Sequence, residues 1–127
     1  DRLLDKKTKE WLRSLIDLAV RGANEMNLYD EPIVEARADW ALPSRLLVGK
    51  IRPQMDLREF HWFICGEVPL DYLPGNVAAA PREALRHFAM KWQLDAERAD
   101  DTERADVLIE NAEAIYALAD DERVWES

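Results

Sequence analysis

Four side chains of the types that bind metal ions lie in the middle of the sequence: His61, Cys65, Glu67 and His87. In an extended strand residues two apart share a face, so the first three would point the same way. His61 and Cys65, however, would lie roughly 13 Å apart along a strand. Zinc ligands lie about 2.0–2.3 Å from the ion, so these two cannot share one. We therefore predict no metal site and no cofactor.

A thiol nucleophile would require Cys65 together with His87 and Asp71. A neighbouring base generates the thiolate that attacks a substrate. No signature of a cysteine enzyme surrounds Cys65, which stands alone in the sequence between Ile64 and Gly66. We interpret Cys65 as a small core residue and assign no catalytic residue, so a non-enzymatic protein is the favoured hypothesis.

The segment 66–72 is the strongest candidate for ligand binding, because it places acidic groups and a phenol just past a predicted strand, where loops often carry function. The helix that follows adds basic residues lying off its apolar stripe. The candidate binding residues are Glu67, Asp71, Tyr72, Arg82, Arg86, His87 and Lys91. A pocket around Tyr72, Arg86 and His87 would bind a small anion or a peptide carboxylate. Alternatively these groups are structural, with Tyr72 packed in the core and the basic residues paired with acids of the last helix.

The formal charge of −9 is concentrated near the C-terminal end. Residues 95–127 contain 12 acidic and 3 basic residues, whereas residues 1–94 contain 14 of each. Such a surface repels nucleic acid, so we predict no DNA or RNA partner. It is either a solvated helical face or a docking surface for a basic protein partner. Phosphate-binding loops and hydrolase motifs are absent, since Gly49-Lys50 lacks the rest of a P-loop.

Length and composition favour one domain over residues 1–127. The lone cysteine is typical of a reducing compartment, and no apolar run is long enough for a membrane, so we expect a cytoplasmic protein. The predicted fold class is α+β, with an N-terminal helix, a two-stranded antiparallel hairpin that can belong to a small sheet, and two C-terminal helices. The helices are predicted over 3–25, 81–99 and 102–119, the strands over 45–52 and 57–65, a short helix over 33–40 and a connector over 66–81.

The hairpin register is predicted from its side chains. Pairing positions whose numbers sum to 109 places Lys50 opposite Glu59 and Gly49 opposite Phe60. That register matches charges and covers the glycine with an aromatic ring.

Apolar residues at helical spacing predict the core face of each helix. For helix 81–99 they are Ala84, Leu85, Phe88, Ala89, Trp92 and Ala96. For helix 102–119 they are Ala105, Leu108, Ile109, Ala112, Ile115, Tyr116 and Ala119. Met90 and Leu94 lie on the opposite side of helix 81–99, so they need cover from another helix of the chain or from the second subunit of a homodimer.

Two segments resemble a known family. Residues 62–72 run from a strand through Gly66-Glu67-Val68-Pro69, and residues 84–97 form a helix containing His87-Phe88 and Lys91-Trp92-Gln93. Over roughly 58–98 the chain resembles the bacterial family of uncharacterised proteins called domain of unknown function 4826. The resemblance implies bacterial origin and a small cytosolic domain. It implies no activity, and its motif residues carry no assigned roles.

Overall fold

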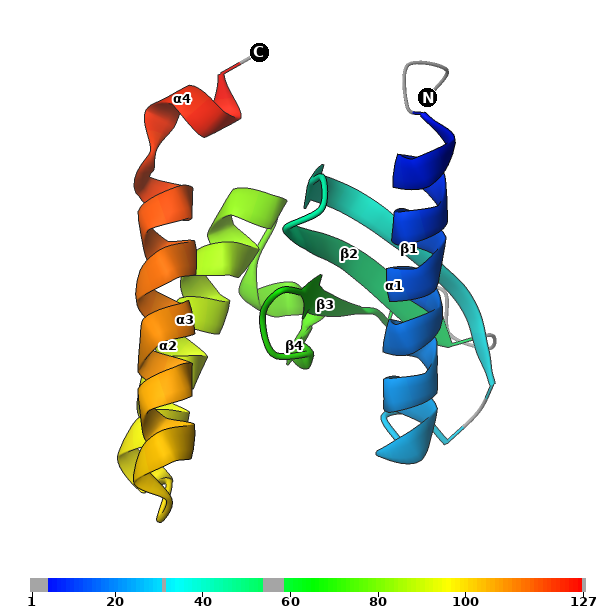
Figure 1. Cartoon of the computed structure of the whole chain (residues 1–127). Helices are drawn as coiled ribbons and strands as arrows, with labels where there is room; N and C mark the ends of the chain where they lie inside the picture. The colour runs from blue at the N-terminus through cyan, green and yellow to red at the C-terminus, as the bar shows by residue number, and fades with distance from the viewer. Residues whose placement is uncertain (1–4, 31, 54–58, 127) are drawn as a thin grey trace. The chain divides into compact units, whose positions relative to one another are not determined.

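The computed structural model describes residues 5–30, 32–53 and 59–126, although not the side chains of Ile33 and Val34 (Figure 1). The chain divides into two compact units, Asp1–Gly75 and Asn76–Ser127. The first unit consists of a helix and a four-stranded antiparallel sheet, and the second is helical. The α+β class is confirmed, but the sheet has four strands where two were predicted. The single domain stays a prediction.

Helix α1, Lys6–Glu25, ends where predicted, whereas the predicted start at residue 3 lies outside the described residues. Its N-cap is Asp5, whose carboxylate accepts a hydrogen bond from the Thr8 N–H at 2.7 Å and so satisfies one free donor of the first turn. Ala19 and Ala23 are buried against the sheet. Leu18, by contrast, is 38% exposed.

The sheet contains β1 (Ile33–Leu42), β2 (Leu46–Pro53), β3 (His61–Gly66) and β4 (Asp71–Pro74), in that spatial order. The short helix predicted over 33–40 is wrong, because these residues lie in β1. Charged and small residues alternate there from Glu35 to Asp39, which is the period of a strand and not of a helix. The connector predicted over 66–81 likewise contains the short edge strand β4.

The predicted register of β2 and β3 is also wrong. Paired positions sum to 112, so Gly49 lies opposite Phe63 and Lys50 opposite Trp62. The shift arises because β3 begins only at His61, which lengthens the β2–β3 connection. An odd shift moves each side chain of one strand to the other face of the sheet. Gly49 is nevertheless covered by an aromatic ring, since a Cβ atom there would lie 2.6 Å from Phe63 Cζ and would also collide with the Arg37 carbonyl oxygen.

The face of the sheet that packs against α1 forms the core of the first unit. Its buried sheet residues are Leu47, Ile51, Phe63, Cys65 and Tyr72. The Tyr72 hydroxyl donates a hydrogen bond to the Ala19 carbonyl at 2.5 Å, which ties β4 to α1. On the other face Val48, Trp62 and Ile64 are fully buried. Both faces of the central strands are therefore apolar, as the composition of β2 and β3 predicts.

The second unit contains α2 (Pro81–Arg98), α3 (Thr102–Asp120) and α4 (Glu122–Trp125), after a 3₁₀ turn, η1, at Gly75–Val77. Pro81 occupies the first turn of α2, and the Asp101 carboxylate caps α3 by accepting from the Glu103 N–H. The predicted bounds of both long helices agree with the structure to within one residue, and the predicted core face of α2 is confirmed. Among the described residues, no helix has the length and apolarity that a bilayer crossing requires.

The predicted core face of α3 is correct only in part. Leu108, Ala112, Ile115 and Ala119 are buried, and α3 packs against α2. Ile109 and Tyr116, by contrast, are 40% and 51% exposed. Each residue turns a helix by about 100°, so these two lie beside the buried face rather than within it.

Candidate functional site

Three of the predicted binding residues lie in the first unit, where they make structural contacts. The exposed Glu67 carboxylate pairs with Arg45 at 3.2 Å. The Asp71 carboxylate accepts a hydrogen bond from the Tyr72 N–H at 2.8 Å. Burial raises the pKa of Tyr72 to about 12, and its proton is donated to the Ala19 carbonyl. The Tyr72 hydroxyl is thus a neutral link between α1 and β4.

The other four predicted binding residues lie on α2. Arg82 Nε donates to the Ala119 carbonyl at 2.7 Å, so the start of α2 lies beside the end of α3 and the two helices are antiparallel. Lys91 pairs with Asp95 one turn further along its own helix at 2.9 Å. Arg86 and His87 are half-buried. The predicted pocket would combine Tyr72 of the first unit with Arg86 and His87 of the second, and it stays a prediction.

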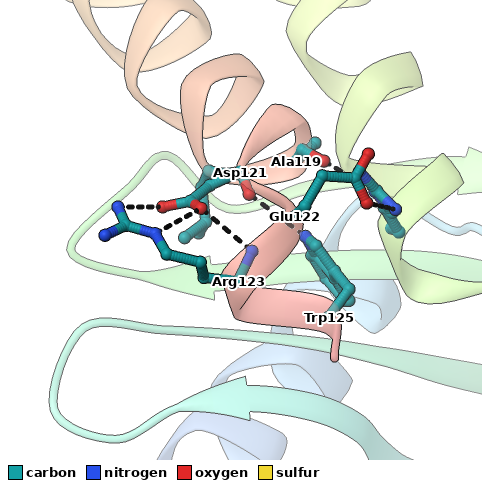
Figure 2. Close-up of polar contacts among 7 residues, drawn as sticks. Ala119, Asp121, Glu122, Arg123 and Trp125 are labelled. Atoms are coloured by element: carbon teal, nitrogen blue, oxygen red, sulfur yellow. Dashed lines mark hydrogen bonds and ion pairs between the residues drawn. The ribbon is translucent and has the colours of Figure 1, made fainter. Parts of the chain in front are cut away.

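Arg82 makes its contacts at the junction of α3 and α4, which Figure 2 shows. The Arg82 guanidinium pairs with Glu122 at 3.2 Å and lies 6.0 Å from the centre of the Trp125 ring. Trp125 Nε1 donates to the Leu118 carbonyl at 3.1 Å (Figure 2). Asp121 caps α4 by accepting from the Arg123 N–H. Arg82 therefore closes the end of the helical hairpin, which is a structural role.

Cys65 and His61, considered above for metal or thiol chemistry, also make contacts that stabilise the fold. Cys65 is fully buried and its thiol donates to the Leu15 carbonyl at 3.6 Å. Burial raises the pKa of Cys65 to about 12, which disfavours the thiolate. The interpretation of Cys65 as a small core residue is confirmed. His61 Nδ1 lies 2.7 Å from the Tyr29 hydroxyl. The described part of the chain holds no group of three or more residues suited to a metal ion.

The exposed side of α3 carries a regular row of residues that the sequence reasoning did not recognise. Acidic and apolar side chains alternate along it at intervals of three and four residues: Asp106, Ile109, Glu113, Tyr116 and Asp120. Because a helix has about 3.6 residues per turn, residues at this spacing lie on one stripe. All five are exposed. We call this row the α3 stripe; it extends about 21 Å along the helix.

The α3 stripe lies in the more strongly charged unit. Residues 76–127 contain 13 acidic and 6 basic residues, a formal charge of −7, against 13 acidic and 11 basic, or −2, in residues 1–75. Within the described residues, no basic side chain forms an ion pair with Asp106, Glu113 or Asp120. The stripe therefore offers unneutralised carboxylates on both sides of two exposed apolar side chains.

The spacing of the α3 stripe was visible in the sequence. Ile109 and Tyr116 were assigned to the core because they widen an apolar face that already contained Leu108 and Ile115. The contrary signal was that each of the two is preceded by an acid three residues earlier and followed by one four residues later. A residue flanked in this way along its own stripe is typical of an exposed surface.

A family model for the domain of unknown function 4826 matches residues 5–125, and the chain belongs to this family. The match covers both units and confirms the resemblance identified from residues 58–98. Neither a curated protein nor a solved structure gives a match.

Proposed function

We propose that this member of the family of unknown function 4826 is a non-enzymatic interaction module whose α3 stripe binds a basic amphipathic helix of a partner protein. One observation carries the proposal: the exposed alternation of carboxylates with Ile109 and Tyr116 along α3. A solvated helical face alone would favour polar residues at those two positions.

The spacing of the stripe favours a helix as the partner. Side chains at alternating intervals of three and four form the seam along which two helices pack at about 20° in left-handed pairs. A partner helix would place its apolar residues against Ile109 and Tyr116. It would place Lys or Arg near the three carboxylates, at intervals of seven residues.

The charge of the stripe disfavours a second copy of the same surface as its partner. In a pair of α3 stripes the carboxylates of one chain would face those of the other, and like charges brought together at an interface cost binding energy. A homodimer would use a different surface. Met90 and Leu94 of α2 are 54% and 48% exposed, so the described residues do not cover them, and a second subunit there is a separate proposal.

We place this module in the bacterial cytoplasm, because its one cysteine is a buried free thiol and its composition suits a reducing compartment. A non-enzymatic role is supported by the surroundings of the titratable groups. Catalysis by the Cys65 thiol or the Tyr72 hydroxyl would need these groups to be accessible to a substrate. Both are hydrogen-bonded inside the first unit.

The proposal is tested with a synthetic 21-residue helical peptide that carries Leu and Lys in the complementary three–four pattern, labelled for fluorescence anisotropy. The matching peptide with Glu in place of Lys is the negative probe. We expect the Lys peptide to bind and its affinity to fall with added salt, since exposed charges are screened within about 10 Å at 0.1 M salt. The Glu peptide is expected not to bind.

The decisive variant is Asp106→Asn/Glu113→Gln/Asp120→Asn. Three exposed ion pairs of about 0.5 kcal/mol each predict a loss of about tenfold in affinity. Equal binding to the variant and the unmodified protein, or no binding of the Lys peptide to either, would contradict the proposal.

A matched control removes the same three charges away from the stripe. Glu97, Asp100 and Glu126 are exposed residues of the second unit that lie outside α3. The variant Glu97→Gln/Asp100→Asn/Glu126→Gln is expected to bind the Lys peptide within about twofold of the unmodified protein, because only long-range charge is lost. A tenfold loss in this control would show that the net charge, and not the stripe, attracts the peptide.

A further inference from the structure

A second candidate site lies on the sheet of the first unit, far in sequence from α3. It is a surface pocket of about 250 Å³ lined by Glu35, Arg37, Lys50, Arg52 and Phe60. The strand register explains why these residues meet: Glu35 of β1 pairs with Arg52 of β2, and Arg37 pairs with Lys50. Directly opposed residues in an antiparallel pair share a face, so four charged side chains gather on one surface. We call it the cationic pocket.

Lys50 is held in the pocket without being neutralised. Its Nζ lies 5.1 Å from the centre of the Phe60 ring and 4.9 Å from that of the Trp62 ring. Cation–π contacts of this kind fix an ammonium group without cancelling its charge. Among the described residues no carboxylate pairs with Lys50. Its charge is therefore available to an anion.

The two arginines are only partly neutralised. Arg52 Nε pairs with Glu35 at 2.5 Å, which uses one of the five N–H donors of the guanidinium. Arg37 lies 4.0 Å from Asp39, at the limit of an ion pair. The pKa of Glu35 is lowered, first by the hydrogen bond from Arg52, then by the charge of Arg52 and, to a smaller extent, of Arg37. Three cations and one carboxylate leave the lining with a formal excess of two positive charges.

We infer that the cationic pocket binds a small phosphate monoester, with the phosphate against Arg37, Lys50 and Arg52 and the organic part against Phe60. A phosphate monoester carries about two negative charges at neutral pH, which matches the excess in the lining, whereas a carboxylate carries one. Arginine donors match phosphate oxygens in geometry. Ligand pockets commonly have volumes of about 300–1,000 Å³, so this smaller pocket suits a phosphate with a few carbon atoms.

The test is a titration of the full chain with phenyl phosphate, followed by the backbone amide resonances of residues 35–37 and 50–52. Benzoate, with the same ring and one charge, is the matched probe. We expect saturable shifts with phenyl phosphate, at least tenfold weaker binding of benzoate, and weaker phosphate binding at pH 5 than at pH 7.5 because the second phosphate ionisation has a pKa near 6. Equal affinity for the two probes, or shifts that do not saturate, would overturn the inference.

Variants localise the site and separate it from the proposed function. Lys50→Gln is expected to weaken phenyl phosphate binding about tenfold, since a charge-assisted contact is lost. Arg45→Gln removes the same charge from an exposed residue just before β2 that pairs with Glu67, and it is expected to leave binding unchanged. An equal loss in both variants would overturn the assignment. Lys50→Gln should bind the Lys peptide normally, so failure of one proposal is distinguishable from failure of the other.

A phosphoserine peptide provides the last arm of the test. If the pocket takes a small molecule, free phosphoserine and a peptide containing it bind within about threefold of each other, because no further contacts are made. Peptide binding more than tenfold tighter would overturn the small-molecule assignment in favour of a phosphorylated protein.

Discussion

The two units of the chain use their polar and ionisable side chains in opposite ways. In the first unit Tyr29, Cys65 and Tyr72 hydrogen-bond to carbonyl groups 22, 50 and 53 residues away along the chain. In the second unit the charged side chains form ion pairs at the surface, within one helix as in Lys91–Asp95 or between α2 and α4 as in Arg82–Glu122. Buried titratable groups in this protein therefore hold the fold together, and binding is better sought where charge is exposed and unneutralised.

The largest expected effect tests whether the first unit depends on its contacts across the sheet. Phe63 is fully buried, packs in the α1–sheet core and covers Gly49. Phe63→Ala should lower the free energy of unfolding by about 3–5 kcal/mol, because it removes a buried ring and leaves a cavity. Urea denaturation followed by circular dichroism measures the loss. Phe60→Ala is the control. Phe60 directly precedes β3 and is only partly buried, so a smaller loss of stability is expected.

A smaller effect tests the polar links of the first unit through pH. The pKa of His61 is lowered, mainly by burial and against the charge of Glu59, and its Nδ1 contacts the Tyr29 hydroxyl. The unfolded chain thus binds a proton at higher pH than the folded chain. The contribution of His61 to stability is fully present above about pH 6.5 and is lost as pH falls through that value toward the lower folded pKa.

The measurement compares the unmodified protein with His61→Gln by urea denaturation at pH 7.5 and pH 5. The unmodified protein should lose more stability on acidification than the variant. The carboxylates titrate in both proteins, whereas only the unmodified protein contains the His61 imidazole. An equal loss in the two proteins would mean that His61 is as easily protonated in the fold as outside it.

The elements that the sequence predicted well are those whose signal is local. Helix α2 follows from Pro81 and from six apolar residues at helical spacing, all of which are buried. Strand β1 was missed because its small side chains include Ala36 and Ala38, which mark a strand only weakly. Strand β4 is four residues long and is defined by its pairing with β3. No pattern within those four residues predicts that pairing.

The register of β2 and β3 was mispredicted for a related reason. Matching Lys50 with Glu59 was chemically reasonable, but register also depends on where the connection ends, and that is decided by tertiary packing. Pairing Gly49 with an aromatic ring was the correct principle applied to the wrong residue, because Phe63 and not Phe60 covers it.

The candidate sites show the same limit. Arg82 and Lys91 were selected because they lie off the apolar stripe of α2, which spacing predicts correctly. Their partners, the Ala119 carbonyl and Asp95, could not be chosen from spacing alone. The cationic pocket was out of reach because it requires the pairing of β1 with β2, and β1 had been read as a helix.

The smallest expected effect on stability is that of Tyr116→Gln, which tests whether Tyr116 of α3 belongs to the core or to the surface. Leu108 is buried and Tyr116 is 51% exposed, although the sequence assigned both to one apolar face. Leu108→Ala should lower the free energy of unfolding by about 2–5 kcal/mol, whereas Tyr116→Gln should change it by about 0.5 kcal/mol or less. Thermal and urea denaturation of the two variants measure the difference, and Gln is at least as good a helix former as Tyr, so propensity does not bias the result. Tyr116→Gln should also weaken binding of the Lys peptide, because an apolar contact of the seam is lost. If instead it destabilises the protein as much as Leu108→Ala does, Tyr116 is part of the core, the α3 stripe is not a free surface, and the proposed interaction has no site.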